Sequence, residues 1–242
     1  MIHATYAIWL RHMRKFLRNR EELGGLLIQP ILWVGLFGVG MGRMLATQND
    51  YLSFMLPGIL ALTALGGAAG GGMMFLDERL RGIMREYMVA PIPRLSILLG
   101  HMLATVSKAF FQITIVCAIG VLAGATFPNS MGEIARGFIA LLCFTLGFAG
   151  IALAVASRSR SIMGYHGMIF LFNLPLLFAS NALYELDSAP TWMQWVALCN
   201  PATWLIAVMR GSESALVYLS GLVIFAVLGT WFALQRFQQL TK

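Results

Sequence analysis

Few side chains in this sequence could do catalytic or metal chemistry, and they are scattered. The histidines are His3, His12, His101 and His166. None lies in an HExxH pattern or in another metal-ligand spacing with a carboxylate. No acidic pair falls within an apolar run, and no GxSxG motif is present. We therefore predict no catalytic residue and no metal site, with each histidine at a surface or an interface.

The sequence also lacks a nucleotide-binding loop. A Walker A motif ends in Gly-Lys followed by Ser or Thr, because its backbone amides and lysine hold the phosphates. The lysines are Lys15, Lys108 and Lys242, and none follows a glycine. We predict no cofactor in this chain, so that any ATP-driven work would need ATP and Mg²⁺ on a separate ATPase chain.

Lys108 is the candidate for ion coupling, because ion-driven carriers place ionisable groups near the bilayer midplane. The stretch from Ala109 to Thr126 corresponds to about 27 Å of helix, nearly the whole hydrocarbon core. Lys108 is therefore expected near the inner membrane boundary, where its stem can snorkel. This placement disfavours an ion-coupled secondary carrier but leaves it as an alternative.

The elements that would position any site are transmembrane helices. The 242 residues are 59% hydrophobic and 11% charged, with a mean hydropathy of +0.77. Soluble domains carry about 25% charged residues, so a soluble enzyme is excluded. The composition predicts an all-α integral membrane protein. Its net charge of +7 indicates basic cytoplasmic loops rather than nucleic-acid binding.

Six apolar runs are long enough to span a bilayer, which takes about 20 residues. They are Leu23–Leu45, Ser53–Leu76, Leu95–Thr126, Ile134–Ala156, Met163–Tyr184 and Ala215–Leu234. Six spans put both termini on one side, and most basic residues gather on that side. The positive-inside rule therefore predicts cytoplasmic termini.

Residues 1–22 are predicted to form an amphipathic helix on the inner leaflet, followed by one membrane domain over residues 23–242. Its apolar arc holds Ile2, Tyr6, Trp9, Leu10, Met13, Phe16 and Leu17. Arg11, Arg14, Lys15 and Arg18 lie opposite, as expected for a helix at an anionic surface. Packing of this helix on a partner protein is the alternative.

Residues 185–214, predicted to lie outside the membrane, are too apolar for a solvated loop. Three tryptophans lie there, and Asn200-Pro201 interrupts the segment. We predict two short re-entrant helices joined at that dipeptide. Glycine pairs such as Gly66/Gly70 and Gly67/Gly71 indicate close helix packing, either within the chain or against a second copy.

The segment from Asp77 to Arg94 has the pattern of a short docking helix. One face holds Leu80, Ile83, Met84, Tyr87 and Met88, and the other holds Glu78, Arg79, Arg81, Arg85 and Glu86. Pro91 and Pro93 end the helix. Such a helix suits a groove in a partner protein, or else it lies on its own bundle or on lipid.

The chain resembles the membrane subunit of ABC-2 type exporters, the family of daunorubicin-type drug exporters and polysaccharide exporters. Three motifs in order carry the resemblance over nearly the whole chain. The first matches Arg79, Gly82, Ile83, Met88, Pro91, Ile92 and Gly100, and the second is Leu56-Pro57-Gly58. The third matches Pro175, Phe178, Ser180, Pro190, Trp192, Gln194, Asn200, Pro201, Trp204 and Arg210.

The resemblance implies a permease in the bacterial cytoplasmic membrane, paired with a second copy or a related permease and driven by a cytoplasmic ABC ATPase. The residues implied in ATPase coupling are Arg79, Leu80, Gly82, Ile83, Met84, Arg85, Glu86, Tyr87 and Pro91. Those implied in capping the outer mouth are Trp192, Asn200, Pro201, Trp204 and Arg210.

The second and fifth helices would line the transport path. The candidate path residues are Met73, Met74, Phe75, Phe172, Asn173, Phe178 and Asn181. Methionine and aromatic side chains suit a hydrophobic or amphipathic compound, either drug-like or lipid-linked. Asn181 stands where many relatives have glycine. The alternative outside transport is a membrane scaffold that recruits a cytoplasmic protein through residues 77–94.

Overall fold

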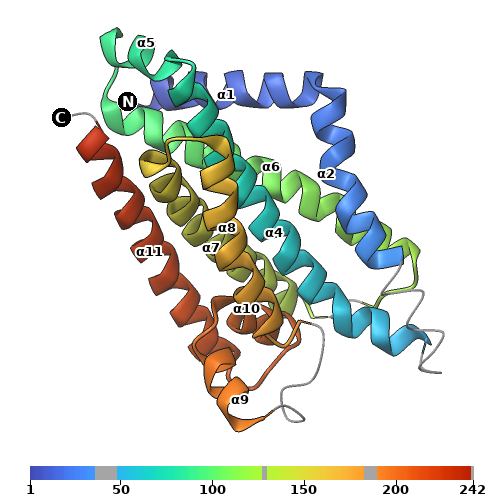
Figure 1. Ribbon diagram of the computed structural model, residues 1–242. Helices are drawn as coiled ribbons and strands as arrows, with labels where there is room; N and C mark the ends of the chain where they lie inside the picture. The colour runs from blue at the N-terminus through green and yellow to red at the C-terminus, as the bar shows by residue number, and fades with distance from the viewer. Residues whose placement is uncertain (36–47, 127–129, 183–189, 241–242) are drawn as a thin grey trace.

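The computed structural model describes residues 1–35, 48–126, 130–182 and 190–240, and the regular structure within them is entirely helical (Figure 1). This confirms the all-α prediction. The helices are α1 (Ile2–Arg18), α2 (Arg20–Leu32), α4 (Gln48–Leu80), α5 (Ile83–Val89), α6 (Arg94–Leu122), α7 (Met131–Arg158), α8 (Ile162–Phe178), α9 (Thr191–Leu198), α10 (Pro201–Met209) and α11 (Ala215–Leu240).

Four of the described helices are long and apolar enough to cross a membrane. The spans are Tyr51–Leu80, Arg94–Leu122, Met131–Arg158 and Ala215–Gln239, within α4, α6, α7 and α11. They match the second, third, fourth and sixth predicted runs. The fifth run forms the 17-residue helix α8. The first run begins as α2, and its residues 36–47 lie outside the described residues, so the count of six spans stays a prediction.

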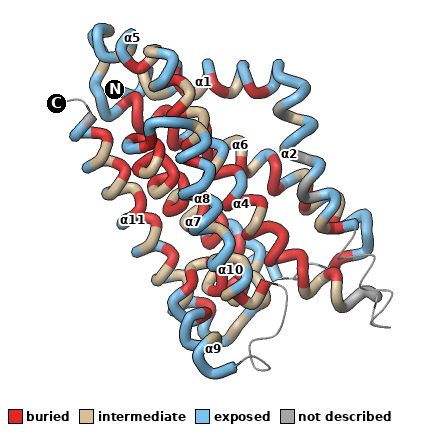
Figure 2. Tube along the Cα trace, viewed as in Figure 1, coloured by how far each residue is buried: buried red, intermediate tan, exposed pale blue. Residues whose placement is uncertain are grey.

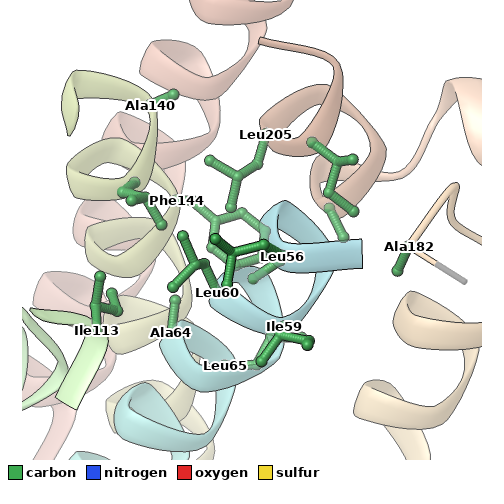
Figure 3. Close-up of a cluster of buried hydrophobic side chains, with 14 of the residues drawn as sticks. Leu56, Ile59, Leu60, Ala64, Leu65, Ile113, Ala140, Phe144, Ala182 and Leu205 are labelled. Carbon is green, nitrogen blue, oxygen red and sulfur yellow. The ribbon is translucent and has the colours of Figure 1, made fainter. Parts of the chain in front are cut away.

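The largest core cluster surrounds α4, where Leu56 and Leu60 pack near Phe144 of α7 and Leu205 of α10 (Figure 3). Burial is concentrated along this centre, whereas much of α8 is exposed (Figure 2). Figure 1 places both ends of the chain at the same end of the bundle as α5, while α9 and α10 lie at the other end.

Glycines set how closely the long helices approach. A Cβ on Gly67 would lie 2.7 Å from the Cβ of Ala109, so this face of α4 packs against α6. Gly66 and Gly70 face the other way, and no atom lies within 4 Å of the position that a Cβ would take on either. The Gly67/Gly71 pair thus serves packing within the chain, and the Gly66/Gly70 pair lies on an open face of α4.

Helix α1 crosses the end of the bundle and packs along the first half of α6 (Figure 1). Its buried stripe is Ile8, His12 and Phe16, spaced at i, i+4, i+8. The predicted apolar arc is therefore only partly the packing face: Ile2 is 80% exposed and Tyr6 is 54% exposed. One stripe packs on the bundle, and the exposed apolar side chains remain available to lipid. The helix ends at Arg18, earlier than the predicted boundary at residue 22.

Candidate coupling and transport sites

The predicted docking helix is split by a turn. Helix α4 continues through Leu80, and α5 begins only at Ile83. Gly82 stands between them with φ +82°, the left-handed region that glycine enters without strain. The prediction that Arg79 and Leu80 lie in the docking helix is therefore wrong, because they form the last turn of the preceding span.

Arg79 holds the end of α4 against the end of α7. Its guanidinium donates hydrogen bonds to the backbone carbonyls of Ala156 (2.9 Å), Ser157 and Ser159 (3.0 Å). The last carbonyls of a helix have no partner within the helix, so a guanidinium fork can satisfy several of them together. Arg79 of the first motif thus makes its contacts inside its own chain.

Replacing Gly82 with alanine is expected to lower the free energy of unfolding by about 1–2 kcal/mol, the cost of a left-handed residue with a Cβ. Nothing lies within 4 Å of a Cβ at this position, so the loss would come from backbone strain alone. Gly82→Asn should recover much of the loss, because asparagine tolerates this conformation. Denaturation of the three proteins in the same detergent measures the difference, and equal stability of G82A and wild type would contradict it.

Helix α5 presents one side to its own bundle and the other to its surroundings. Met84 is buried, and the half-buried Tyr87 accepts a hydrogen bond from the guanidinium of Arg11. Burial raises the pKa of the Tyr87 phenol, so the hydroxyl stays protonated at neutral pH. The side chains that remain exposed are Leu80, Arg85, Glu86, Met88, Val89 and Pro91. Met84 therefore packs within the chain instead of filling a partner's groove.

Three buried polar side chains meet next to this surface: His12, Glu78 and His101. The prediction that each histidine lies at a surface or an interface is wrong for two of the four. Burial lowers the pKa of His12 to about 3, and the neighbouring His101 contributes in the same direction, so His12 is neutral at neutral pH. The missed signal was spacing, since His12 continues the stripe of Ile8 and Phe16, and His101 lies one helical turn from Ile97.

The third motif forms a clasp at the opposite end of the bundle. The side-chain oxygen of Asn200 accepts a hydrogen bond from the Ala202 amide (2.9 Å) and caps α10. Its nitrogen donates to the carbonyls of Leu176 and Ala179, each at 2.9 Å, at the end of α8. Pro201 occupies the first turn of α10, where its missing amide hydrogen costs nothing. Asn200-Pro201 therefore joins three helices.

Two more residues of this motif tie α10 to its neighbours. The indole of Trp204 donates to the Leu198 carbonyl at 2.7 Å. Arg210 donates to the Phe54 carbonyl at 2.8 Å, and its guanidinium carbon lies 3.7 Å from the centre of the Phe54 ring. Trp192 is instead 67% exposed. The two short helices are present as predicted, and their re-entrant character stays a prediction.

The candidate path residues do not share one cavity. Phe172 and Asn173 line an apolar cavity of about 420 Å³ bounded by α4, α7, α8, α11 and the α9–α10 corner. Phe178 is exposed and Asn181 is half-buried after the end of α8. Phe75 is only 1% exposed and packs against the ring of His101, so it faces no open path within this chain.

Met73 and Met74 lie near the α5 end of α4, and both are half-buried. Nζ of Lys108 lies 3.6 Å from Sδ of Met74 and 4.8 Å from the ring centre of Phe16 in α1. Lys108 thus lies at the level of the helix that crosses the bundle end. A second cavity of about 670 Å³ lies among α4, α6 and α7 at the other end, with Glu133 and Arg210 among its lining residues.

Comparison with known proteins matches this chain to a transporter family. A family model described as ABC-2 type transporter matches residues 3–214. A relative from Cyanophora paradoxa that carries the name of a transport permease, ycf38, is 32% identical over 189 residues, which are 76% of this chain and 65% of the relative.

Two further relatives carry names from drug resistance and efflux. A doxorubicin resistance ABC transporter permease protein, DrrC, so named as probable in Mycobacterium tuberculosis, is 23% identical over 83% of this chain and 73% of its own length. A multidrug ABC transporter permease, YbhR, named as probable in Escherichia coli, is 26% identical over 63% of this chain and 41% of its own length. The chain thus spans 41% to 73% of the lengths of these three relatives.

Proposed function

Starting from the fact that the chain belongs to the ABC-2 type transporter family, we propose that it is the permease subunit of an ATP-driven exporter. It would work in the bacterial cytoplasmic membrane with both termini in the cytoplasm. A separate cytoplasmic ABC ATPase, with its ATP and Mg²⁺, would supply the energy. The cargo would be a hydrophobic or amphipathic compound moved out of the cell.

The exposed side of α5 is the observation that carries this proposal. It lies at the bundle end that holds both termini, and it presents Met88 and Val89 (88% exposed) beside Arg85 and Glu86. An apolar centre with a charged rim is the usual composition of a docking surface. Because Arg79 and Met84 fix the base of α5 to its own bundle, a displacement of this surface would reach the spans directly.

A double substitution tests the docking surface. Met88→Asp with Val89→Asp is expected to lower recovery of the ATPase at least tenfold when the tagged permease is purified from its native host. A carboxylate buried in an interface loses hydration that nothing replaces. Far-end Met131, 80% exposed in the first turn of α7, offers a matched control, and Met131→Asp should retain the ATPase. Equal recovery of a P-loop ATPase with both variants would refute the proposal.

Pairing with a second permease is supported by apolar faces left open in the single chain. On α8, Phe170, Leu171 and Phe172 are each more than half exposed. On α4, Gly66 and Gly70 are open and would let another helix approach closely. We propose that a second copy or a related permease covers these faces, with the transport path between the two chains.

The proposed cargo class rests on the apolar cavity beside α8. Its volume of about 420 Å³ falls in the range of small-molecule sites, and Asn173 supplies a polar point in an otherwise mostly apolar wall. The relatives named for doxorubicin resistance and multidrug transport fit an amphipathic cargo. The position of Lys108 beside the crossing helix α1 supports the membrane boundary over the midplane and so disfavours an ion-coupled carrier.

A further inference from the structure

Three side chains from three helices converge at the base of α5: His12 of α1, Glu78 of α4 and His101 of α6. Each is at most 2% exposed. One nitrogen or carboxylate oxygen from each lies within 4.8 Å of the other two. The convergence is long-range, since it joins the crossing helix to two different spans.

The polar atoms of this cluster lack ordinary partners. Within the described residues, none of the four imidazole nitrogens of His12 and His101 makes a hydrogen bond, and neither does Oε2 of Glu78. Buried polar atoms in folded proteins are nearly always hydrogen-bonded. Five such atoms in one place indicate that something else binds their lone pairs.

The separations match those of metal ligands. Nε2 of His101 lies 3.4 Å from Oε2 of Glu78, and Nε2 of His12 lies 3.8 Å from the same oxygen. Ligands at about 2.1 Å from a tetrahedral zinc ion are about 3.4 Å apart. We propose that His12, Glu78 and His101 bind a divalent transition-metal ion of the Zn²⁺ class, with a fourth position left for water.

The donor set selects this class of ion. Two imidazoles and one carboxylate are ligands of zinc sites that keep an open position, whereas Mg²⁺ and Ca²⁺ prefer oxygen ligands alone. Nη2 of Arg11 lies 3.5 Å from Oε1 of Glu78, which orients the carboxylate and leaves Oε2 facing the histidines. The edge of Phe75 packs against the His101 ring at 5.2 Å between centres and holds that ring in place.

A metal ion at this site would clamp α1 to α4 and α6 at the base of the docking surface. Unlike a hydrogen bond, it would join three helices through one centre. The proposal does not depend on the transport function, because it rests on side chains that meet within one chain.

The test is zinc binding by the full chain in lipid nanodiscs, purified with a tag that contains no histidine. After stripping with EDTA, incubation with ZnCl₂ and desalting, wild type is expected to retain one zinc per chain by elemental analysis. Added ZnCl₂ should also raise its melting temperature. With CoCl₂, the wild type should show the visible d–d absorption of four-coordinate cobalt.

Matched variants separate this site from adventitious binding. His12→Gln and His101→Gln should each weaken zinc binding at least tenfold, whereas His166→Gln changes an exposed histidine and should bind as wild type. A stripped wild type that retains no zinc and whose melting temperature ignores ZnCl₂ would overturn the proposal. So would undiminished zinc binding in a His12→Gln, His101→Gln double variant.

Discussion

Replacing Gly150 with alanine is expected to lower the free energy of unfolding by about 3 kcal/mol, or to prevent folding. A Cβ there would overlap the backbone carbonyl of Gly229 and lie 2.8 Å from the Thr230 amide nitrogen. No side chain can rotate away from a backbone clash, so α7 and α11 would have to separate. Overpacking a well-packed interior costs about 1–3 kcal/mol, and rigid neighbours put this case at the upper end.

Gly70→Ala is the matched control for Gly150→Ala. Gly70 also lies inside a long apolar helix, but nothing lies within 4 Å of its Cβ position. Alanine is the better helix former by about 0.5–1 kcal/mol, so this variant should be unchanged or slightly more stable. Reversible unfolding in mixed detergent micelles compares the two. The packing argument fails if both variants unfold at the same denaturant concentration.

Replacing Asn200 with alanine is expected to cost about 3 kcal/mol. The cap of α10 is worth about 1 kcal/mol. The carbonyls of Leu176 and Ala179 would lose their common donor beside a residue that is only 6% exposed, at about 1 kcal/mol or more each. The loss should be local as well as global, because the end of α8 would be freed from the α9–α10 corner. Faster amide hydrogen exchange at Ala179 would report that local release.

A serine variant separates the two roles of Asn200. Asn200→Ser keeps an oxygen that can cap α10 but lacks the amide donors to the α8 carbonyls. Its unfolding free energy should therefore fall between those of wild type and Asn200→Ala, with hydrogen exchange at Ala179 as fast as in the alanine variant. A serine variant as stable and as protected as wild type would show that the two carbonyl bonds contribute nothing.

Much of the architecture was predictable because long apolar runs have few other options in a bilayer. Four of the six predicted runs form helices of spanning length, and the two short helices meet at Asn200-Pro201 as expected. The extent of the docking helix was not predictable from periodicity. Leu80 and Ile83 keep helical spacing through the turn at Gly82, and only the positive φ there reveals the interruption.

The site residues were harder to place because the same side-chain types serve packing and function. Arg79 and Met84 fit an exposed docking helix by sequence, but both contact their own bundle. The His12–Glu78–His101 cluster escaped detection because its members lie 66 and 23 residues apart in the chain, and no local pattern joins α1 to α4 and α6. Contacts between distant helices are set by tertiary packing, which one sequence does not display.

Helix α4 is unbroken from Gln48 to Leu80, and 33 residues of α-helix are about 50 Å long. Guanidinium groups hold it near both ends, Arg210 on the Phe54 carbonyl and Arg79 on the end of α7. A rod fastened in this way acts as a lever. A tilt of α4 started by a push on α5 would arrive at the α9–α10 corner in the same instant, with no chain of intermediate rearrangements. The two faces of the membrane would then share a single mechanical part.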